Sequence, residues 1–423
     1  MKMPHSWVET TLGTVCDAIL GQSPPGSAYN DNRNGLPFFQ GKAEFGALYP
    51  MARKWTTEGN KRAQPGDVLV SVRAPVGPTN LAPFECVIGR GLAALRPTAV
   101  TTTRFVLYQI RATEDRLASI ATGSTFSAIS GDQLRNHGFV LPPLPEQERI
   151  VAAIEEQFSR LDAGWSALTS AERRVNHLKA AAMVRAVSGD WPLKSLSDVT
   201  EDQTYGSSAK ATDDHEDGMP IVRMGNIQDG RVDLLTGVKF LPRDHPDASK
   251  FALRRGDLLF NRTNSPELVG KSAVYSGVDG AACFASYLIR VRVTDACDAR
   301  WVALYLNSPA GRRWAASVRT QQVGQANING TKLAALPLPL PPIEEQARRL
   351  HEYERQTTIA ESLSRSIGST LARSNALRRA ILARAFSGRL VPQIPDDEPA
   401  FELLARIASD HRKTAKPRRR RRA

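Results

Sequence analysis

Residues 141–158 read LPPLPEQERIVAAIEEQF, and residues 340–357 read LPPIEEQARRLHEYERQT. The two stretches align without a gap at an offset of 199 positions, and both place a glutamine, Gln147 or Gln346, six residues after the leading leucine. Proline is tolerated at the start of a helix but not in its interior, and acidic residues favour the first turn. Each stretch therefore predicts the start of a helix, and the pair predicts an internal repeat.

Further matched segments extend the repeat in both directions. Those at the same offset of 199 are ISGDQL (129–134) with INGTKL (328–333), and LKAAAMVRAVSG (178–189) with LRRAILARAFSG (377–388). Those at smaller offsets are PGDVLVSVR (65–73) with RGDLLFNRT (255–263), and LPFFQG (36–41) with MPIVRM (219–224). A drifting offset indicates loops of different length, whereas a constant offset indicates helices of equal length. We therefore interpret the chain as a tandem duplication.

The segments from about 146 to 187 and from about 345 to 386 each predict one long helix, since neither contains a proline. Their apolar residues recur largely in alternating steps of four and three, the spacing of a coiled-coil seam. The predicted seam residues are Ile154, Phe158, Leu161, Trp165, Leu168, Val175 and Leu178 in the first helix, and Ile367, Leu371, Leu377 and Ile381 in the second. Glu172 and Lys179 interrupt one row of the first helix, which predicts a stutter there.

The length of these helices favours pairing with each other. A helix of 42 residues spans about 63 Å, which exceeds the diameter of a small domain. The alternative, two ordinary amphipathic helices packed on separate domains, is therefore disfavoured. Because the first helix leads away from the first globular part and the second helix must return, the predicted pair is antiparallel.

The rest of the chain consists of short β-like runs punctuated by glycine and proline, with short helices between them. The predicted fold class is α+β: two α/β heads separated by two long helices that form an antiparallel coiled coil, with an internal pseudo-twofold repeat. The predicted segments are the first head (1–145), the first helix (146–189), the second head (190–343), the second helix (344–391) and a basic C-terminal tail (392–423).

Composition places this chain among ordinary globular proteins. It has 423 residues, of which 41% are hydrophobic and 23% charged. No apolar run approaches the roughly 20 residues that span a bilayer, and the start, MKMPHSWVETTLG, lacks the apolar core of a secretory signal. The four cysteines lie far apart and form no CxxC pair. We therefore expect a cytoplasmic protein with no membrane partner and no structural metal.

The net charge of +13 is unevenly distributed. Residues 412–422, RKTAKPRRRRR, hold eight basic side chains and no acidic one, so the remainder of the chain has a net charge of only +5. A basic tail of this kind either binds a polyanion or stays solvated.

Catalytic signatures are absent or incomplete in the sequence. Gly270-Lys271-Ser272 resembles the end of a P-loop, but Ser265 stands where that loop requires glycine. The seven histidines do not cluster, and no NPPY or DPPY tetrapeptide of amino-methyltransferases occurs. The sequence thus predicts no catalytic residue and no cofactor bound by this chain. A self-sufficient methyltransferase or nuclease is disfavoured.

Each head contains a Gly-Asp turn that leads a β run into a polar, basic loop: PGDVLVSVRAPVGPTN (65–80) and RGDLLFNRTNSPELVGK (255–271). The Gly-Asp pairs themselves are interpreted as structural turns. Arginine pairs with guanine, and asparagine with adenine, in the major groove of DNA. The polar residues that follow strands are therefore predicted to contact DNA: Gln40, Lys42, Arg73, Arg90, Arg223, Asn226, Arg262, Asn264 and Lys271.

Taken together, these motifs resemble the specificity subunit of type I restriction–modification systems over residues 5–391. The resemblance rests on LPPLPEQERIVAAIEEQ and LPPIEEQARRL, on the helix ends RAVSG and RAFSGRLVPQ, and on the loops GDVLVSVRAPVG and GDLLFNRTNSPELVGK. It implies two target-recognition domains, each reading one half of an asymmetric, bipartite site in double-stranded DNA. It also implies helices that act as spacers and as docking surfaces.

The partners that this resemblance implies perform the chemistry. Two modification subunits would bring S-adenosylmethionine, and restriction/translocase subunits would use ATP and Mg, while this chain would not be an enzyme. The alternative from a different class is a non-catalytic coiled-coil scaffold with two protein-binding heads. Sequence-dependent DNA binding separates the two hypotheses.

Overall fold

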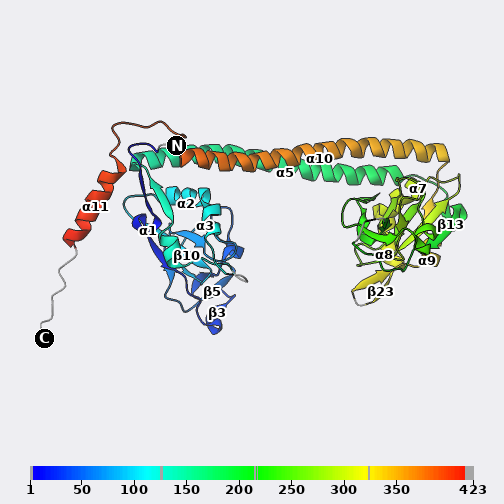
Figure 1. The fold of residues 1–423 in the computed structure, drawn as a ribbon, viewed down its shortest axis with the longest axis horizontal. Coiled ribbons are helices and arrows are strands. Elements are labelled where there is room, and N and C mark those ends of the chain that lie inside the picture. Colours follow the sequence, from blue (N-terminus) through cyan, green and yellow to red (C-terminus); the bar gives the residue numbers. More distant parts are fainter. Residues whose placement is uncertain (1–2, 124–126, 214–215, 217, 323, 415–423) are drawn as a thin grey trace. The chain divides into compact units, whose positions relative to one another are not determined.

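The structure is a computed structural model in which the chain divides into two compact units, each containing one head (Figure 1). Unit 1 comprises Met1–Leu168 and Ser369–Ala423, and unit 2 comprises Thr169–Gly368. The residues that the structure describes are 3–123, 127–213, 216, 218–322 and 324–414. The arginine run of the predicted tail lies outside them.

Two long helices extend through both units. Helix α5 spans Leu144–Val187 and helix α10 spans Ile343–Ala385, with 44 and 43 residues respectively. Their first residues are separated by the same 199 positions that relate the two proline stretches. The two predicted helices are therefore present, each beginning about two residues earlier than expected.

The buried residues of α5 and α10 correct the predicted seam. Leu178 is 61% exposed and Leu377 is 46% exposed, whereas Ser374 is only 7% exposed. In α10 the row of buried and half-buried residues keeps steps of four and three throughout. In α5 the same row is interrupted at the exposed Glu172, as predicted, and then resumes in the same register from Val175 through Lys179 to Ala182, so the predicted shift of the row is absent. Lys179 is half-buried, which its long aliphatic stem allows. The other predicted seam residues are buried or half-buried: Ile154, Phe158, Leu161, Trp165, Leu168, Val175, Ile367, Leu371 and Ile381.

Within each unit the start of one long helix lies beside the end of the other. In unit 1 the guanidinium of Arg378 lies 5.2 Å from the ring centroid of Phe158 and forms an ion pair with Asp162. In unit 2 the Nη1 atom of Arg349 donates to the carbonyl oxygens of Ala186 (3.0 Å) and Ser188 (2.6 Å). Each unit therefore contains a direct contact between α5 and α10.

The first head contains a five-stranded sheet of order β3-β5-β4-β9-β6 and a four-stranded sheet of order β2-β10-β7-β8. Its strands are β1 (Val8–Thr11), β2 (Cys16–Leu20), β3 (Tyr29–Asn30), β4 (Leu36–Phe39), β5 (Lys54–Thr56), β6 (Arg62–Ala63), β7 (Val68–Ser71), β8 (Thr79–Leu81), β9 (Cys86–Ile88), β10 (Leu92–Pro97) and β11 (Gly138–Leu141). Its helices are α1 (Leu12–Val15), α2 (Thr103–Ala112), α3 (Glu114–Ser119) and α4 (Gly131–Arg135). Phe105 of α2 belongs to a hydrophobic core that includes Val68, Leu95 and Ile154, so this core joins the four-stranded sheet to α5.

The second head has a four-stranded sheet of order β13-β22-β18-β20 and three-stranded sheets of order β17-β14-β21 and β19-β24-β23. Its strands are β12 (Leu193–Ser195), β13 (Thr200–Tyr205), β14 (Gly218–Val222), β15 (Ile227–Gln228), β16 (Arg231–Val232), β17 (Lys239–Pro242), β18 (Leu258–Asn261), β19 (Thr263–Asn264), β20 (Ser272–Val274), β21 (Cys283–Phe284), β22 (Leu288–Val293), β23 (Thr320–Gln322), β24 (Gln325–Asn327) and β25 (Pro337–Pro339). Its helices are α6 (Pro246–Lys250), α7 (Ala299–Asn307), α8 (Pro309–Val318) and α9 (Gly330–Ala334). The α+β content of both heads confirms that part of the prediction.

The glutamine that is repeated in the two proline stretches, Gln147 or Gln346, forms hydrogen bonds between each long helix and its own head. Both side chains are fully buried, and both use the amide oxygen and the amide nitrogen. The partners of Gln147 are the hydroxyl of Thr101 (2.9 Å), the amide of Thr102 (3.2 Å) and the carbonyls of Val100 (2.9 Å) and Pro142 (3.0 Å). The partners of Gln346 are the amide of Asp298 (2.9 Å) and the carbonyls of Ala296 (3.2 Å) and Pro341 (2.8 Å). The repeated motif is thus a joint between head and helix.

Residues beyond the repeat pack against unit 1. Gln393 Nε2 donates to Glu146 Oε1 (2.5 Å), and Asp397 forms an ion pair with Arg149 (2.6 Å). Helix α11 (Ala400–Thr414) then contributes Leu403 to the hydrophobic core of unit 1. None of the helices in the described ranges combines the length and apolar character needed to cross a lipid bilayer.

Candidate nucleic-acid interface

In the first head, a parallel pair of strands brings distant polar residues to one edge. Strand β4 pairs in parallel with β9, with Phe38 opposite Val87 and Phe39 opposite Ile88. Parallel strands end at the same edge of a sheet, so the residues after β4 meet those after β9. Gln40 and Lys42 follow β4, whereas Arg90 follows β9.

A third strand end joins this edge. The amide of Val72, just after β7, donates to the carbonyl of Gly91 (2.9 Å), and Arg73 comes next in the chain. A side chain at Gly91 would place its Cβ 2.3 Å from the carbonyl oxygen of Gln40, so the close approach requires glycine. The structure thus brings all four candidates of the first head to one cavity of about 460 Å³: Gln40, Lys42, Arg73 and Arg90.

The electrostatics of this cavity suit a polyanion. Lys42, Arg73 and Arg90 are exposed, and within the part of the chain that the structure describes none of them forms an ion pair. None of the described residues that line the cavity is acidic. By contrast, the buried Asp67 of the same head is neutralised by Arg96 at 2.8 Å. Unpaired cations at a concave edge attract phosphate groups and the acceptor atoms of bases.

The second head repeats this construction. Strand β14 pairs in parallel with β21, with Ile221 opposite Cys283 and Val222 opposite Phe284. The amide of Arg262, just after β18, donates to the carbonyl of Tyr287 (3.0 Å), which is the counterpart of the bond between Val72 and Gly91. Three strand ends therefore meet at one edge here as well.

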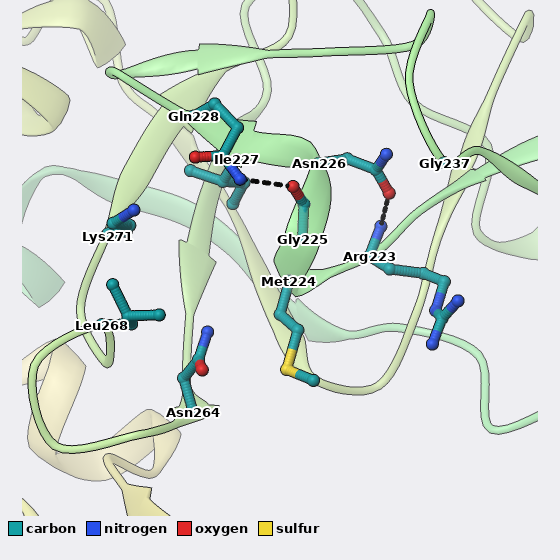
Figure 2. A pocket seen from close by; sticks show the side chains of 10 residues that line it. All are labelled: Arg223, Met224, Gly225, Asn226, Ile227, Gln228, Gly237, Asn264, Leu268 and Lys271. Carbon is teal, nitrogen blue, oxygen red and sulfur yellow. Dashed lines mark hydrogen bonds between the residues drawn. The ribbon is translucent and has the colours of Figure 1, made fainter. Parts of the chain in front are cut away.

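The corresponding cavity in the second head has a volume of about 260 Å³. Figure 2 shows its lining, with Met224 and Asn264 on one side, Leu268 and Lys271 next to them, and Gln228 at the far end. The sequence candidates that line it are Arg223, Asn226, Asn264 and Lys271. Arg223, Asn264 and Lys271 are half-buried.

Asn226 has a structural role, which corrects its prediction as a DNA contact. Its side chain is only 3% exposed. Its Oδ1 accepts from the amide of Arg223 (3.0 Å), as Figure 2 shows. Its Nδ2 donates to the carbonyl of Thr236 (3.2 Å). Both ends of the amide are therefore used to hold the turn after β14.

Arg262 is the one candidate of the second head that does not line the cavity. Its guanidinium stacks on the ring of Tyr205 at 4.8 Å and donates to the carbonyl of Ser286 at 3.3 Å. The backbone bonds show that Arg262 occupies the place of the buried Val72, whereas Thr263 occupies the place of Arg73. Arg262 therefore packs against the head, and its prediction as a base contact loses its support.

The Gly-Asp pairs are structural turns, as predicted. Gly66 and Gly256 have φ angles of +88° and +94°, which glycine adopts without strain. Asp67 accepts from the amide of Gln64, and Asp257 pairs with Arg292 at 2.7 Å.

Other candidate chemistry is not assembled in the described residues. Ser272 begins strand β20 and not the helix that a P-loop requires. The part of the chain that the structure describes contains no group of three potential metal ligands. Burial raises the pKa of all four cysteine thiols to about 12, which keeps them protonated and unreactive: Cys16, Cys86, Cys283 and Cys297.

Sequence reasoning missed several lining residues of the two cavities. Met224 lies two residues after strand β14, so its proximity to a strand end was a usable signal, whereas Gln228 belongs to the short strand β15. Leu268 lies in an otherwise polar loop and is 39% exposed, which is unusual for a leucine without a partner. Ser23 and Tyr29 lack such a signal, since they reach the first cavity only through tertiary folding.

Comparison with known proteins shows which family this chain resembles. The model of the type I restriction modification DNA specificity domain matches the chain twice, over residues 4–164 and 188–380. The type I restriction enzyme EcoKI specificity subunit of Escherichia coli K12 is 24% identical over 449 residues, covering 97% of this chain and 96% of that subunit. The putative type I restriction enzyme MjaX specificity subunit of Methanocaldococcus jannaschii is 39% identical over 157 residues, covering 36% of this chain and 37% of that protein.

The fold itself has a solved relative. The crystal structure of the HsdS subunit from Thermoanaerobacter tengcongensis matches with a TM-score of 0.55 at 21% identity, over 92% of this chain and 98% of that one. Duplicated α+β domains, each followed by a long helix, define the class of protein to which this architecture corresponds. The chain belongs to the family of type I restriction–modification DNA specificity subunits.

Proposed function

We propose that this chain reads an asymmetric, bipartite site in double-stranded DNA, one half with each head, on behalf of a type I restriction–modification complex. The observation that supports this proposal most directly is the duplicated strand-edge cavity. Each head gathers unpaired cations and amide side chains where a parallel strand pair ends. Cations suit phosphate contacts, and arginine and amide groups suit base reading.

The two long helices would set the distance between the half-sites. We propose that α5 and α10 pair along their length as an antiparallel coiled coil, so that the duplicated halves are related by a pseudo-twofold axis. The steps of four and three, unbroken in α10 and interrupted in α5 only at the exposed Glu172, support this arrangement. The contacts between α5 and α10 found separately within each unit support it as well. In this scheme the proposed segments are 1–145, 146–189, 190–343, 344–391 and 392–423.

The helices would also dock the partner subunits. Leu178, Ile359 and Leu363 are each about half exposed or more, although all three lie on the long helices of unit 2. Leu178 and Leu363 each lie one residue before a member of the buried row of their own helix, so they occupy the same heptad position. Residues at the same heptad position lie on one flank of an antiparallel helix pair. Exposed apolar side chains on a shared flank mark a protein interface.

The occupants of this surface would be two modification subunits, with restriction/translocase subunits joining the complex. S-adenosylmethionine, ATP and Mg would be bound by these partners, and the specificity chain would be non-catalytic. The lack of an assembled metal group or P-loop in the described residues is consistent with this division of labour.

The test is single-molecule methylome sequencing of a methylation-free host. One strain produces this chain together with its modification subunit, and two further strains produce each of the two chains alone. A bipartite methyladenine motif is expected only when both are present. If the two chains co-purify but leave no motif, DNA reading by this complex is contradicted. If they do not co-purify, the docking proposal is contradicted, and a scaffold with protein-binding heads becomes the better description.

A further inference from the structure

We infer that the two cavities read different classes of base pair: the first-head cavity reads guanine, and the second-head cavity reads an A·T pair through its amide groups and the thymine methyl. This inference rests on the proposed DNA-reading function and specifies what each head recognises.

Matched backbone hydrogen bonds allow the two cavities to be compared position by position. The amide of Gly89 donates to the carbonyl of Phe39, and the amide of Ala285 donates to the carbonyl of Val222. The residue after each donor is Arg90 in the first head and Ser286 in the second. At the third strand end Arg73 corresponds to Thr263 in the same way. The second head therefore has a hydroxyl side chain at both places where the first head has an arginine. By the same comparison Arg223 stands where the first head has Gln40. The Arg223 side chain is half-buried and extends away from Leu268 and Lys271 (Figure 2), whereas Arg73 and Arg90 are exposed.

The first-head cavity is suited to guanine. Guanine presents two acceptors, N7 and O6, to the major groove, and one arginine fork binds both. Arg73 and Arg90 are exposed there without a carboxylate partner among the described residues. The backbone of Arg90 is anchored at its amide, which donates to Ser23 Oγ (3.3 Å).

The second-head cavity differs in the chemistry of its lining. Met224 and Leu268 contribute apolar surface that has no counterpart of similar size and flexibility in the first cavity (Figure 2). A thymine methyl group is the major-groove feature that apolar side chains recognise.

The amide groups of the same cavity match the adenine of that pair. Asn264 Oδ1 accepts one bond, from the amide of Ser265 (2.8 Å), and Gln228 Nε2 donates one bond, to the carbonyl of Gly225 (2.8 Å). An amide oxygen has two lone pairs and an amide nitrogen two hydrogens, so each side chain retains both a donor and an acceptor. Such a pair of groups binds adenine N7 and N6.

The experiment uses methylome sequencing of the full chain co-expressed with its modification subunit in a methylation-free host. Arg73→Ala and Arg90→Ala test the first cavity, and Asn264→Ala and Leu268→Ala test the second. Arg116→Ala and Leu235→Ala are matched controls, since both side chains are exposed and neither lines a cavity. Arg90→Lys is a further variant that keeps the charge but loses the fork. Co-purification and thermal melting report whether each variant folds.

In the expected result, each arginine variant relaxes a guanine position in one half-site by roughly 10-fold to 100-fold and leaves the other half unchanged. Arg90→Lys relaxes the same position. The Asn264 and Leu268 variants relax an A·T position in the other half-site only.

Three results would overturn the inference. Relaxation of G·C positions by the second-head variants would reverse the assignment. A uniform loss of methylation with an unchanged motif would show that these side chains contact phosphate alone. The absence of any motif from the wild-type complex, although both chains co-purify, would contradict the proposed function itself. The first two results leave that function standing, so the two failures are distinguishable.

Discussion

At the scale of single residues, buried polar side chains hold the joints of this molecule. Gln147 makes four hydrogen bonds without any exposure to water, and the partners in three of them are also buried. A hydrogen bond contributes little net energy, but its loss leaves the partner unsatisfied at a larger cost. Gln346 repeats the arrangement, so a glutamine at the same repeat position hydrogen-bonds each helix to its head.

Gln147→Ala is expected to lower the free energy of unfolding by about 3 kcal/mol, because several buried groups lose their partner. Gln346→Ala is expected to have a similar effect on unit 2. Urea denaturation measures both, with the exposed Gln64→Ala as control. A change below about 0.5 kcal/mol for Gln147→Ala would show that water replaces the amide at no cost.

Glu146 makes the stability of unit 1 depend on pH. Burial raises the pKa of its carboxyl above the ordinary value of 4.5, with Asp397 adding to the effect, although bonds from Trp7 and Gln393 and the nearby Arg149 oppose it. A raised pKa means that the folded state binds the proton more tightly than the unfolded state. The contribution of Glu146 is therefore most favourable below pH 4.5 and declines as the pH rises through the folded-state pKa.

Relative to Glu146→Gln, the wild-type chain is thus expected to lose unfolding free energy as the pH is raised above 4.5. Urea denaturation of both proteins across this pH range provides the measurement. A difference that stays constant with pH would mean that Glu146 titrates equally in the folded and unfolded states.

At the scale of elements, the register of the long helices outweighs the hydrophobicity of single residues. Leu178 and Leu377 are exposed, while Lys179 is half-buried and Ser374 is buried. In the proposed coiled coil each helix keeps a period of 3.5 residues, and shifting the seam to reach one leucine would misplace every other contact in that row.

Ser374 provides a test of this register. Its hydroxyl is buried and has no hydrogen-bond partner in the described structure. Ser374→Ala is therefore expected to raise the free energy of unfolding by about 1 kcal/mol, since it removes the unsatisfied group and improves helix propensity. Val175→Ala, in the buried row, should cost about 1–2 kcal/mol, whereas Leu178→Ala should change stability by less than about 0.5 kcal/mol. A larger loss of unfolding free energy for Leu178→Ala than for Val175→Ala would instead support the sequence-based prediction that Leu178 is a seam residue.

The exposed leucines should instead affect assembly. Leu178→Asp and Leu363→Asp are expected to weaken co-purification with the modification subunit at least about 10-fold while leaving the melting temperature unchanged. Leu235→Asp is the matched control, since Leu235 is 95% exposed and lies in the second head. Equal recovery of the modification subunit by all three variants would exclude this surface as the docking site.

At the scale of the whole molecule, the two heads differ from each other, whereas the two long helices nearly match in length. The heads diverge in the residues that line their cavities, whereas the helices and their glutamine joints stay nearly identical in length and position. One half-site is therefore expected to change without altering the other or the gap between them.

Adding seven residues to both long helices, between Leu168 and Thr169 and between Gly368 and Ser369, tests the spacer role. Seven helical residues add about 10 Å, which is about 3 base pairs of duplex. Methylome sequencing should show a longer unspecified gap between unchanged half-sites. Inserting five residues breaks the steps of four and three and should abolish the motif. A longer helix pair that leaves the gap unchanged would refute the proposed spacer role of the helices.

Periodicity, proline placement and turn residues were sufficient to predict both long helices and the α+β heads, since these signals act between residues close in sequence. The repeat followed instead from motifs that match 199 positions apart. Local signals were also sufficient to find the cations after β4, β7 and β9, because polar residues directly follow apolar runs. The role of Asn226 was not predictable, since a capping side chain and a base-reading one have the same chemistry.

What the sequence by itself determined is therefore the duplication, the helices and most of the residue types at each strand end. Only the tertiary structure decided which of them meet. Parallel pairing of β4 with β9 places Lys42 beside Arg90, 48 positions further along the chain. In the second head Arg262 stacks on Tyr205 outside the cavity, whereas Met224 and Leu268 meet the polar residues that line it. Contacts of this kind arise from pairing between distant segments, which local sequence patterns do not encode.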